Sequence, residues 1–340
     1  MKVVLTGGAG FLGFHLSRGL AEHDRLLLDL ETVAGDELAG AAAIRGDVRD
    51  RELLRRAFDG ADAVVHAAAA LPLWKPAEIR SVNTDGTRAV LDAAQELGVP
   101  RLLHVSSTAV YGIPDHHPLD EDDAMHGVGP YGESKVAAER LVEEARQRGQ
   151  AVAVVRPKTF LGPERLGVFQ ILFEWVRQGR RIPVIGGGRN RYQLLDVEDL
   201  VAAVRLLLEL PAGQANATFN VGAGDFGSVE EDLGALFEHA GSGSRLLRTP
   251  AWLAKGSLSA LEALRLSPLY KWVYGTADQD SWVETGRLRA LGWEPRWSNA
   301  GTLIRTYDWY LANRAGLSQA GVGHRTPWRE GALAILRRFL

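Results

Sequence analysis

A tyrosine and a lysine four residues apart are the first residues of this sequence that can do chemistry together. They lie in Tyr131-Gly132-Glu133-Ser134-Lys135, and on a helix this spacing puts both side chains on one face, one turn apart. A tyrosine has a pKa of about 10, and a neighbouring ammonium group stabilises its phenolate. Tyr131 is therefore a candidate general acid or base near neutral pH.

Two adjacent serines, Ser106 and Ser107, follow an apolar run that predicts a buried strand, Leu102 to Val105. Ligands of open α/β sheets bind at the carboxyl ends of the strands, so we expect one of the two hydroxyls to hold a substrate oxygen beside the tyrosine. A serine at a strand end also serves as a local cap. The residues alone do not decide between these two roles, and they do not show which of the two serines holds the substrate oxygen.

A glycine-rich loop near the N-terminus predicts a dinucleotide site. The loop Thr6-Gly7-Gly8-Ala9-Gly10-Phe11-Leu12-Gly13 lies between an apolar run, Val3 to Leu5, and a helical pattern, Phe14 to Leu20. Glycines let backbone N–H groups approach a pyrophosphate, which then lies at the positive end of the helix. We predict cofactor contacts from this loop, at Gly7, Gly10, Phe11, Leu12 and Gly13.

Acidic residues follow the next two predicted strands. Asp29 closes the second strand sixteen positions after Gly13, about where a carboxylate accepts hydrogen bonds from the adenosine ribose. The next residues are Leu30-Glu31 and include no arginine, so a 2′-phosphate would be repelled and NAD is favoured over NADP. Asp47 and Val48, after the third strand, suit the edge of the adenine.

These candidates need a scaffold, and the N-terminal half supplies one. Short apolar runs alternate there with amphipathic helical patterns, which predicts an α/β fold with a doubly wound parallel sheet of the Rossmann type. The runs are Val3 to Leu5, Leu26 to Leu28, Ala63 to His66, Leu102 to Val105 and Ala151 to Val155. We predict an NAD-binding domain from residues 1–165 with 191–224, a smaller substrate-binding region from 166–190 with 225–315, and an amphipathic C-terminal tail at 316–340.

Composition excludes several classes of function. With 46% hydrophobic and 24% charged residues and a net charge of −3, the chain fits a globular protein and not a nucleic-acid binder. The lack of cysteine excludes disulfides, thiolate catalysis and zinc-thiolate sites. The histidines show no ligand spacing, so we predict no metal. No signal peptide pattern and no apolar run of membrane-span length is seen, which favours the cytoplasm.

Together these features resemble the extended short-chain dehydrogenase/reductase family, also called the NAD-dependent epimerase/dehydratase family, from Lys2 to roughly Asn313. Six motifs in order carry the resemblance: Thr6 to Gly13, His66-Ala67-Ala68-Ala69, Asn83-Thr84-Asp85-Gly86-Thr87, Ser106-Ser107-Thr108-Ala109-Val110-Tyr111-Gly112, Tyr131 to Lys135, and Arg156-Pro157-Lys158-Thr159-Phe160-Leu161-Gly162-Pro163.

The resemblance implies roles for individual residues. The family's catalytic hydroxyl lies four residues before the tyrosine of the Val-Tyr-Gly segment, which selects Ser107. Lys135 is then expected to bind the nicotinamide ribose, Ala67 and Ala68 to line the cofactor, and Asn83 to touch the cofactor or its water network. The family also commonly pairs two long helices per subunit into a dimer interface, so a homodimer through residues 87–97 and 131–147 is expected.

The chain departs from some members of that family. Members that make 4,6-dehydrated sugars resemble Thr-Asp-Glu where this chain has Ser107, Thr108 and Ala109, so dehydratase chemistry lacks its acid pair and is rejected. Members acting on nucleotide sugars usually carry an asparagine at the position of Thr159, a candidate substrate contact. Arg191, in a segment similar to the family's second substrate-contacting segment, is either an anion ligand or a surface arginine.

Three functions stay open at this stage. The first is a dehydrogenase or reductase for a bulky hydrophobic, steroid- or lipid-like substrate, favoured by the apolar stretch between Pro250 and Gly275, which helical core packing also explains. The second is a nucleotide-sugar 4-epimerase that regenerates its bound NAD, and the third a non-catalytic NAD-binding redox sensor. The tail beyond Gly323 is expected to dock on the enzyme's own surface or to touch a membrane peripherally.

Overall fold

The computed structural model describes the chain except for residues 34, 73, 165, 167–168, 264–276 and 318–340. Its contacts divide it into two units. Unit 1 comprises residues 1–158, 197–222 and 283–294, and unit 2 comprises residues 159–196, 223–282 and those from 295 onward. The predicted tail lies outside the described residues except for its first two positions. About half of the apolar stretch after Pro250 also lies outside them.

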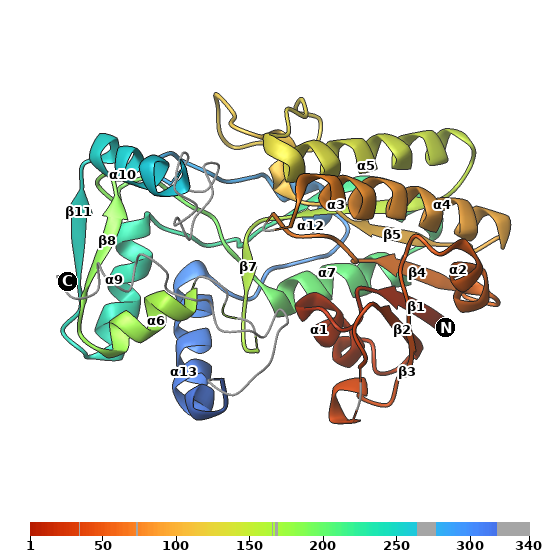
Figure 1. Ribbon diagram of the computed structural model, residues 1–340, viewed down its shortest axis with the longest axis horizontal. Coiled ribbons are helices and arrows are strands. Elements are labelled where there is room, and N and C mark those ends of the chain that lie inside the picture. The colour runs from red at the N-terminus through yellow and green to blue at the C-terminus, as the bar shows by residue number, and fades with distance from the viewer. Residues whose placement is uncertain (34, 73, 165, 167–168, 264–276, 318–340) are drawn as a thin grey trace. The chain divides into compact units, whose positions relative to one another are not determined.

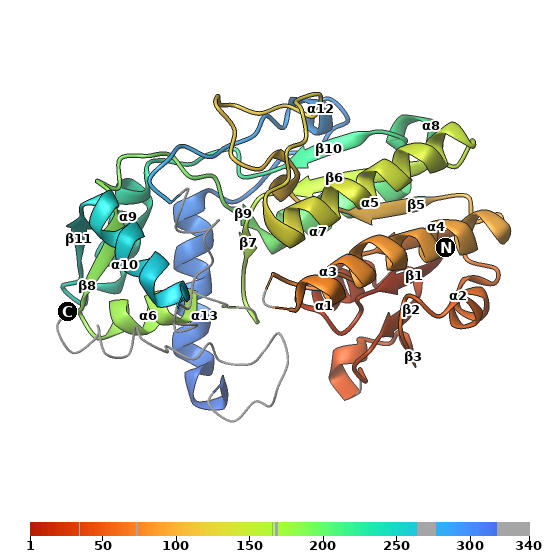
Figure 2. The same ribbon diagram turned by 45° about the horizontal axis from the view of Figure 1, so that its top comes forward.

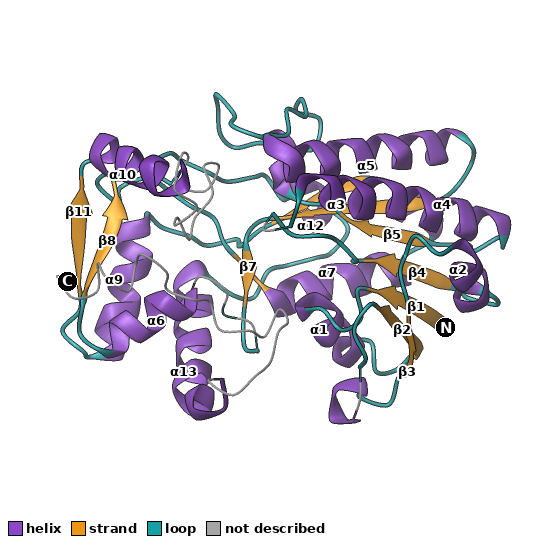
Figure 3. Cartoon of the chain, viewed as in Figure 1, coloured by secondary structure: helices purple, strands orange, loops and turns teal. Residues whose placement is uncertain are grey.

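Unit 1 is built on one parallel sheet of seven strands in the order β10-β6-β5-β4-β1-β2-β3, seen edge-on in Figure 1 and as orange arrows in Figure 3. This order confirms the predicted Rossmann-type α/β fold. The strands are β1 (Lys2–Thr6), β2 (Asp24–Asp29), β3 (Ala42–Arg45), β4 (Ala63–His66), β5 (Leu102–Val105), β6 (Val152–Pro157) and β10 (Thr218–Val221).

Helices cover both faces of this sheet because its central strands are apolar on both sides; every residue of β4, β5 and β6 is buried. One layer contains α2 (Arg51–Phe58), α4 (Gly86–Glu96) and α5 (Gly129–Gln147). The helices α4 and α5 run side by side in both views (Figures 1 and 2). The shorter elements before α4 and α5 are α3 (Pro76–Arg80), the π-helical turn η2 (Ser81–Asp85) and the 3₁₀ turn η3 (Thr108–Tyr111).

On the other face, α1 (Phe11–Gly19) packs against α7 (Val197–Glu209). Unit 1 is completed by η1 (Gly35–Leu38), α8 (Ala212–Ala215) and α12 (Gly286–Arg289). The helix α12 packs beside β10, and the indole N–H of Trp293 donates to the carbonyl of Asp199 in α7 at 3.0 Å. These contacts bring residues 283–294 into unit 1, whereas the sequence had placed them in the substrate-binding region.

Unit 2 contains two parallel strand pairs, β8 (Arg181–Ile185) with β11 (Arg245–Thr249) and β7 (Phe160–Leu161) with β9 (Leu195–Asp196). The pairing of β7 with β9 moves both strands into unit 2, although the expected division put them in the NAD-binding domain. Its helices are α6 (Phe169–Arg177), α9 (Val229–Ala240), α10 (Ala251–Ala263) and α13 (Asn299–Leu317).

The core of unit 2 forms where aromatic side chains of α6 and α13 meet. The ring of Phe173 lies 5.8 Å from that of Tyr307 and 6.1 Å from that of Tyr310. In contrast, Trp252 and Leu253 of α10 are 77% and 50% exposed, so this part of the apolar stretch is not core packing. No helix within the described part of the chain is long and apolar enough to span a membrane.

Candidate active site

The glycine loop joins β1 to α1 at the carboxyl edge of the unit 1 sheet. Gly7 adopts φ +74°, and the N–H groups of Gly7 and Gly8 donate to the carbonyl of Leu28 at 2.9 and 3.2 Å. A Cβ on Gly10 would lie 2.9 Å from the Gly7 oxygen, and one on Gly13 only 2.2 Å from it. The N-cap, Gly10, has no side chain to satisfy the first N–H groups of α1, which suits a pyrophosphate at that end.

The carboxylate of Asp29, at the end of β2, is tied to this loop. Its Oδ2 accepts from the N–H of Ala9 and its Oδ1 from the N–H of Glu31, each at 3.0 Å. The side chain is half-buried, so lone pairs remain for another donor. Asp29 therefore lies beside the glycine loop, as its expected role with the adenosine ribose requires.

Asp47 follows β3 and has a partner that the sequence reading missed. Hydrogen bonds from Arg49, through Nε at 2.9 Å and Nη2 at 2.5 Å, lower the pKa of Asp47, and Arg49 also donates to Ser81 at 3.1 Å. Val48 is buried at 6% exposure within the sheet-facing core. The spacing of Asp47 and Arg49, two residues apart in the sequence, was the signal that could have predicted this ion pair.

The segment after β4 closes on the glycine loop. The N–H of Ala67 donates to the carbonyl of Thr6 at 3.2 Å, and that of Ala68 to the Thr6 hydroxyl at 3.3 Å. A Cβ on Gly7 would lie 2.7 Å from the nitrogen of Ala68. Ala67 and Ala68 are thus in direct contact with the glycine loop, and their predicted contact with the cofactor stays a prediction.

Asn83, which the resemblance implies touches the cofactor or its water network, also ties three segments of unit 1 together. It is 2% exposed; its Oδ1 accepts from the N–H of Ala70 at 2.7 Å, and its Nδ2 donates to the Ala70 carbonyl and to Ser134, at 3.2 and 3.0 Å. Ser134 in turn donates to the Tyr131 carbonyl at 2.7 Å. These bonds connect Asn83 to the start of α5, and its contact with the cofactor or its water network stays a prediction.

Tyr131 and Lys135 lie on the first two turns of α5, whose start carries a proline as helices tolerate. The Nζ of Lys135 lies 6.0 Å from the centre of the Tyr131 ring and donates to the Val105 carbonyl at 2.9 Å. Lys135 is 3% exposed, and this burial lowers its pKa to about 8, although Glu139 opposes the shift. The structure thus places an ammonium group next to the half-buried Tyr131.

The structure separates the two serines. Ser106 is 3% exposed and its hydroxyl donates to the carboxylate of Glu139 at 2.5 Å. Ser107 is half-buried, and its hydroxyl accepts from the N–H of Ala109 at 3.2 Å, so its own proton is available to another partner. Of the two, Ser107 is therefore the one suited to hold a substrate oxygen. The sequence reading missed Glu139, although its i,i+4 spacing from Lys135 was a visible signal.

The two candidate substrate residues lie in unit 2. The hydroxyl of Thr159 is 3.0 Å from that of Tyr192. The guanidinium of the exposed Arg191 lies against two neighbouring rings, 4.6 Å from the centre of Phe226 and 4.9 Å from that of Trp282, a geometry typical of cation-π contact. No sequence signal pointed to these aromatic partners, which come from distant segments.

No group of three histidine, aspartate or glutamate side chains that could hold a metal ion occurs among the described residues. The fold and site together define a Rossmann unit with a dinucleotide loop, an acidic residue after the second strand, and a Ser-Tyr-Lys set at the same edge of the sheet.

Comparison with known proteins agrees with that class. The model of the NAD dependent epimerase/dehydratase family matches residues 3–222. An uncharacterized protein of Sinorhizobium fredii, y4nG, is 37% identical, with 98% of this chain and 85% of that protein covered. A UDP-glucose 4-epimerase of Streptomyces lividans is 30% identical over 78% of this chain and 91% of its own length.

Among solved structures, the dTDP-glucose 4,6-dehydratase DesIV of Streptomyces venezuelae, with NAD and TYD bound, has a TM-score of 0.73. It is 27% identical, and the match covers 93% of this chain and 98% of that one. The chain therefore belongs to the NAD-dependent epimerase/dehydratase family and is an NAD-dependent enzyme. The predicted family, fold class and cofactor are confirmed.

Proposed function

We propose that this protein transfers hydride between NAD and the carbon of a secondary alcohol or ketone, with Ser107, Tyr131 and Lys135 as its catalytic residues. The observation that carries this proposal is the placement of the Lys135 ammonium 6.0 Å from the Tyr131 ring, at the strand edge where Ser107 also lies. NAD, when bound, accepts or returns the hydride. No other cofactor is required.

Each side chain has a defined task. Tyr131 exchanges a proton with the substrate oxygen as general acid or base. Ser107 donates a hydrogen bond to the same oxygen and so orients it. Lys135 supplies a positive charge beside the phenol, which favours its ionised form, and binds the nicotinamide ribose.

The cofactor site of this proposal is the edge of the unit 1 sheet. The pyrophosphate lies on the loop from Gly7 to Gly13, which includes Phe11 and Leu12, and the adenosine ribose lies on Asp29. Asp47 and Val48 contact the adenine, while Ala67 and Ala68 line the cofactor. The close approach of these segments around Gly7 supports one continuous site.

The net outcome depends on whether the ketone leaves. If the enzyme releases the ketone, it is a dehydrogenase or reductase. A bulky hydrophobic substrate for that reaction stays a prediction. A second candidate is 4-epimerisation of a nucleotide sugar, in which the ketone is reduced on its other face by the same NADH; the similarity to the UDP-glucose 4-epimerase favours it. In that case Thr159 and Arg191 are the proposed substrate contacts. Dehydration is not proposed, because Thr108 and Ala109 carry no carboxylate.

The test is a panel of nucleotide sugars, sterols and acyl ketones, assayed for product and for absorbance of NADH. An epimerase forms product without net NADH, whereas a dehydrogenase forms NADH in equal amounts. The Tyr131→Phe variant is expected to lose about 10² to 10⁴ in rate while still binding NAD. Tyr307→Phe, a buried tyrosine of unit 2, is the matched control and should keep its rate. Full turnover by Tyr131→Phe would refute the proposed role of Tyr131. NAD binding by the wild type without turnover of any member of the panel would instead favour a non-catalytic NAD-binding sensor.

We also infer a homodimer through the exposed sides of α4 and α5. Arg140 is an exposed residue of α5, so Arg140→Glu should weaken association in sedimentation velocity, while a monomeric wild type at micromolar concentration would exclude the dimer. A cytoplasmic location and a peripheral membrane contact of the tail stay predictions.

A further inference from the structure

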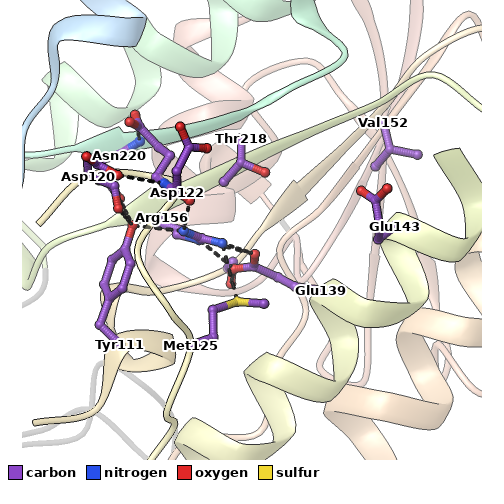
Figure 4. Close-up of polar contacts among 12 residues, drawn as sticks. Tyr111, Asp120, Asp122, Met125, Glu139, Glu143, Val152, Arg156, Thr218 and Asn220 are labelled. Atoms are coloured by element: carbon purple, nitrogen blue, oxygen red, sulfur yellow. Dashed lines mark hydrogen bonds and ion pairs between the residues drawn. The ribbon is translucent and has the colours of Figure 1, made fainter. Parts of the chain in front are cut away.

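A buried cluster of polar side chains gathers around Arg156 and Glu139 (Figure 4). At its centre, the guanidinium of Arg156 in β6 donates to Glu139 in α5, from Nε at 3.0 and 3.1 Å and from Nη2 at 2.7 Å. Both side chains are only 5% exposed. The hydroxyl of Ser106 donates to the same carboxylate at 2.5 Å. Glu139 is thereby held by β6 and by the residue that follows β5.

The other terminal nitrogen of Arg156, Nη1, also donates hydrogen bonds. It donates to the Tyr111 hydroxyl at 2.8 Å and to the Glu121 carbonyl at 3.0 Å. The Tyr111 hydroxyl donates to Oδ1 of Asn220 in β10 at 2.8 Å, and burial raises the pKa of Tyr111 to about 12, so it stays a neutral donor. The cluster therefore fixes Glu139 relative to β5, β6, β10 and η3.

Glu139 also follows Lys135 by one turn of α5. Burial disfavours the charged form of Lys135, and the carboxylate of Glu139 favours it. The other titratable groups that face Lys135 are His66 in β4, His104 in β5 and the Tyr131 ring. Burial lowers the pKa of His66 to about 3 and that of His104 well below its usual range, so both rings are neutral where Lys135 titrates. The histidines thus supply no charge there.

We propose that Glu139 is a positioning residue: its carboxylate holds the hydroxyl of Ser106, which leaves Ser107 to the substrate, and it places a negative charge one turn of α5 from the ammonium group of Lys135. This inference rests on the proposed function for the roles of Lys135 and Ser107, but the charge on Lys135 is measurable without any substrate. Arg156 serves the same end, because it orients the carboxylate and offsets the cost of burying it.

The experiment is an NMR titration of the full chain labelled at the lysine side chains. The sequence has six lysines, and a Lys135→Arg variant assigns the resonance of interest. In Glu139→Gln, which keeps the shape and one acceptor but removes the charge, the pKa of Lys135 is expected to fall below its wild-type value of about 8. Glu139→Asp, which keeps the charge, should recover part of that loss.

Lys158 is the internal control. It is buried at 5% exposure, and burial alone lowers its pKa to about 7, so its titration should not move in Glu139→Gln. A Lys135 pKa that stays at its wild-type value in the folded variant, or a Lys158 pKa that moves equally, would overturn the proposal. If Glu139→Gln does not fold, Glu139→Asp is the second variant: it keeps the charge but shortens the side chain by one methylene group, so the pKa of Lys135 should fall by a smaller amount, and an unmoved Lys135 pKa in that folded variant would overturn the proposal.

A second readout separates positioning from simple structural support. Once a substrate is found, the alkaline limb of the kcat/KM profile of Glu139→Gln should move to lower pH together with the NMR titration of Lys135. A uniform loss of rate with an unmoved limb would contradict the role of Glu139. A moved NMR titration without any catalysis would instead contradict the proposed function.

Discussion

Replacing Gly13 by alanine should strongly weaken NAD binding while leaving most of the fold intact. The added Cβ would lie 2.2 Å from the Gly7 oxygen and 2.7 Å from the Cα and oxygen of Gly8. These are backbone atoms, so relief requires the loop to move by about 1 Å, since carbon–oxygen contacts need more than about 3 Å. The loop that moves is the one that presents N–H groups to the pyrophosphate.

The expected magnitude follows from those donors. A hydrogen bond to a charged group contributes about 1.5 to 3 kcal/mol, so losing two costs at least about 3 kcal/mol, or on the order of 100-fold in Kd. Overpacking at the loop should also lower the free energy of unfolding by about 1 to 3 kcal/mol. Isothermal titration with NAD measures the first quantity, and urea unfolding followed by circular dichroism measures the second.

Gly213→Ala provides the matched control. Gly213 lies in α8 of the same unit, its φ is not positive, and no atom lies within 4 Å of the added Cβ. It should bind NAD as the wild type does, with stability unchanged or raised by up to about 1 kcal/mol. The reasoning would be refuted if Gly13→Ala bound NAD within threefold of wild type, because the loop would then not be the pyrophosphate site.

Three further changes test other features. Asp29→Ser should weaken NAD binding and reduce the preference for NAD over NADP, since the carboxylate beside the loop repels a 2′-phosphate. An unchanged ratio of the Kd values for NAD and NADP would argue against the placement of the adenosine ribose at Asp29. Because the pKa of Lys135 is lowered from 10.5 to about 8, kcat/KM should fall as pH rises past about 8. The contribution of Lys135 to the free energy of unfolding should instead rise between about pH 8 and 10.5, because the unfolded chain binds more protons there. Phe58→Ala, at a fully buried site, should cost about 3 to 5 kcal/mol in urea unfolding, against less than about 0.5 kcal/mol for Trp252→Ala, which is 77% exposed.

The residues that act locally were predictable from the sequence. The glycine loop, the strand before it and the Tyr131-Lys135 spacing depend on neighbours within a few positions, and the structure has these elements where the sequence predicted them. The helix after the loop begins at Phe11, three residues earlier than predicted. The missed residues depend on distant partners. Arg156 and Glu139 are seventeen residues apart, and Arg191 contacts Phe226 and Trp282 from two other segments.

The sequence by itself therefore determined the fold class, the dinucleotide loop and the pair of Tyr131 and Lys135, because periodicity and short spacing encode them. Only the tertiary structure decided that Ser106 is hydrogen-bonded to Glu139, that Asn83 is hydrogen-bonded to Ala70 and Ser134, and that residues 283–294 join unit 1. The physical reason is that a buried hydrogen bond depends on which strands and helices pack against each other, and a local sequence pattern does not encode that packing.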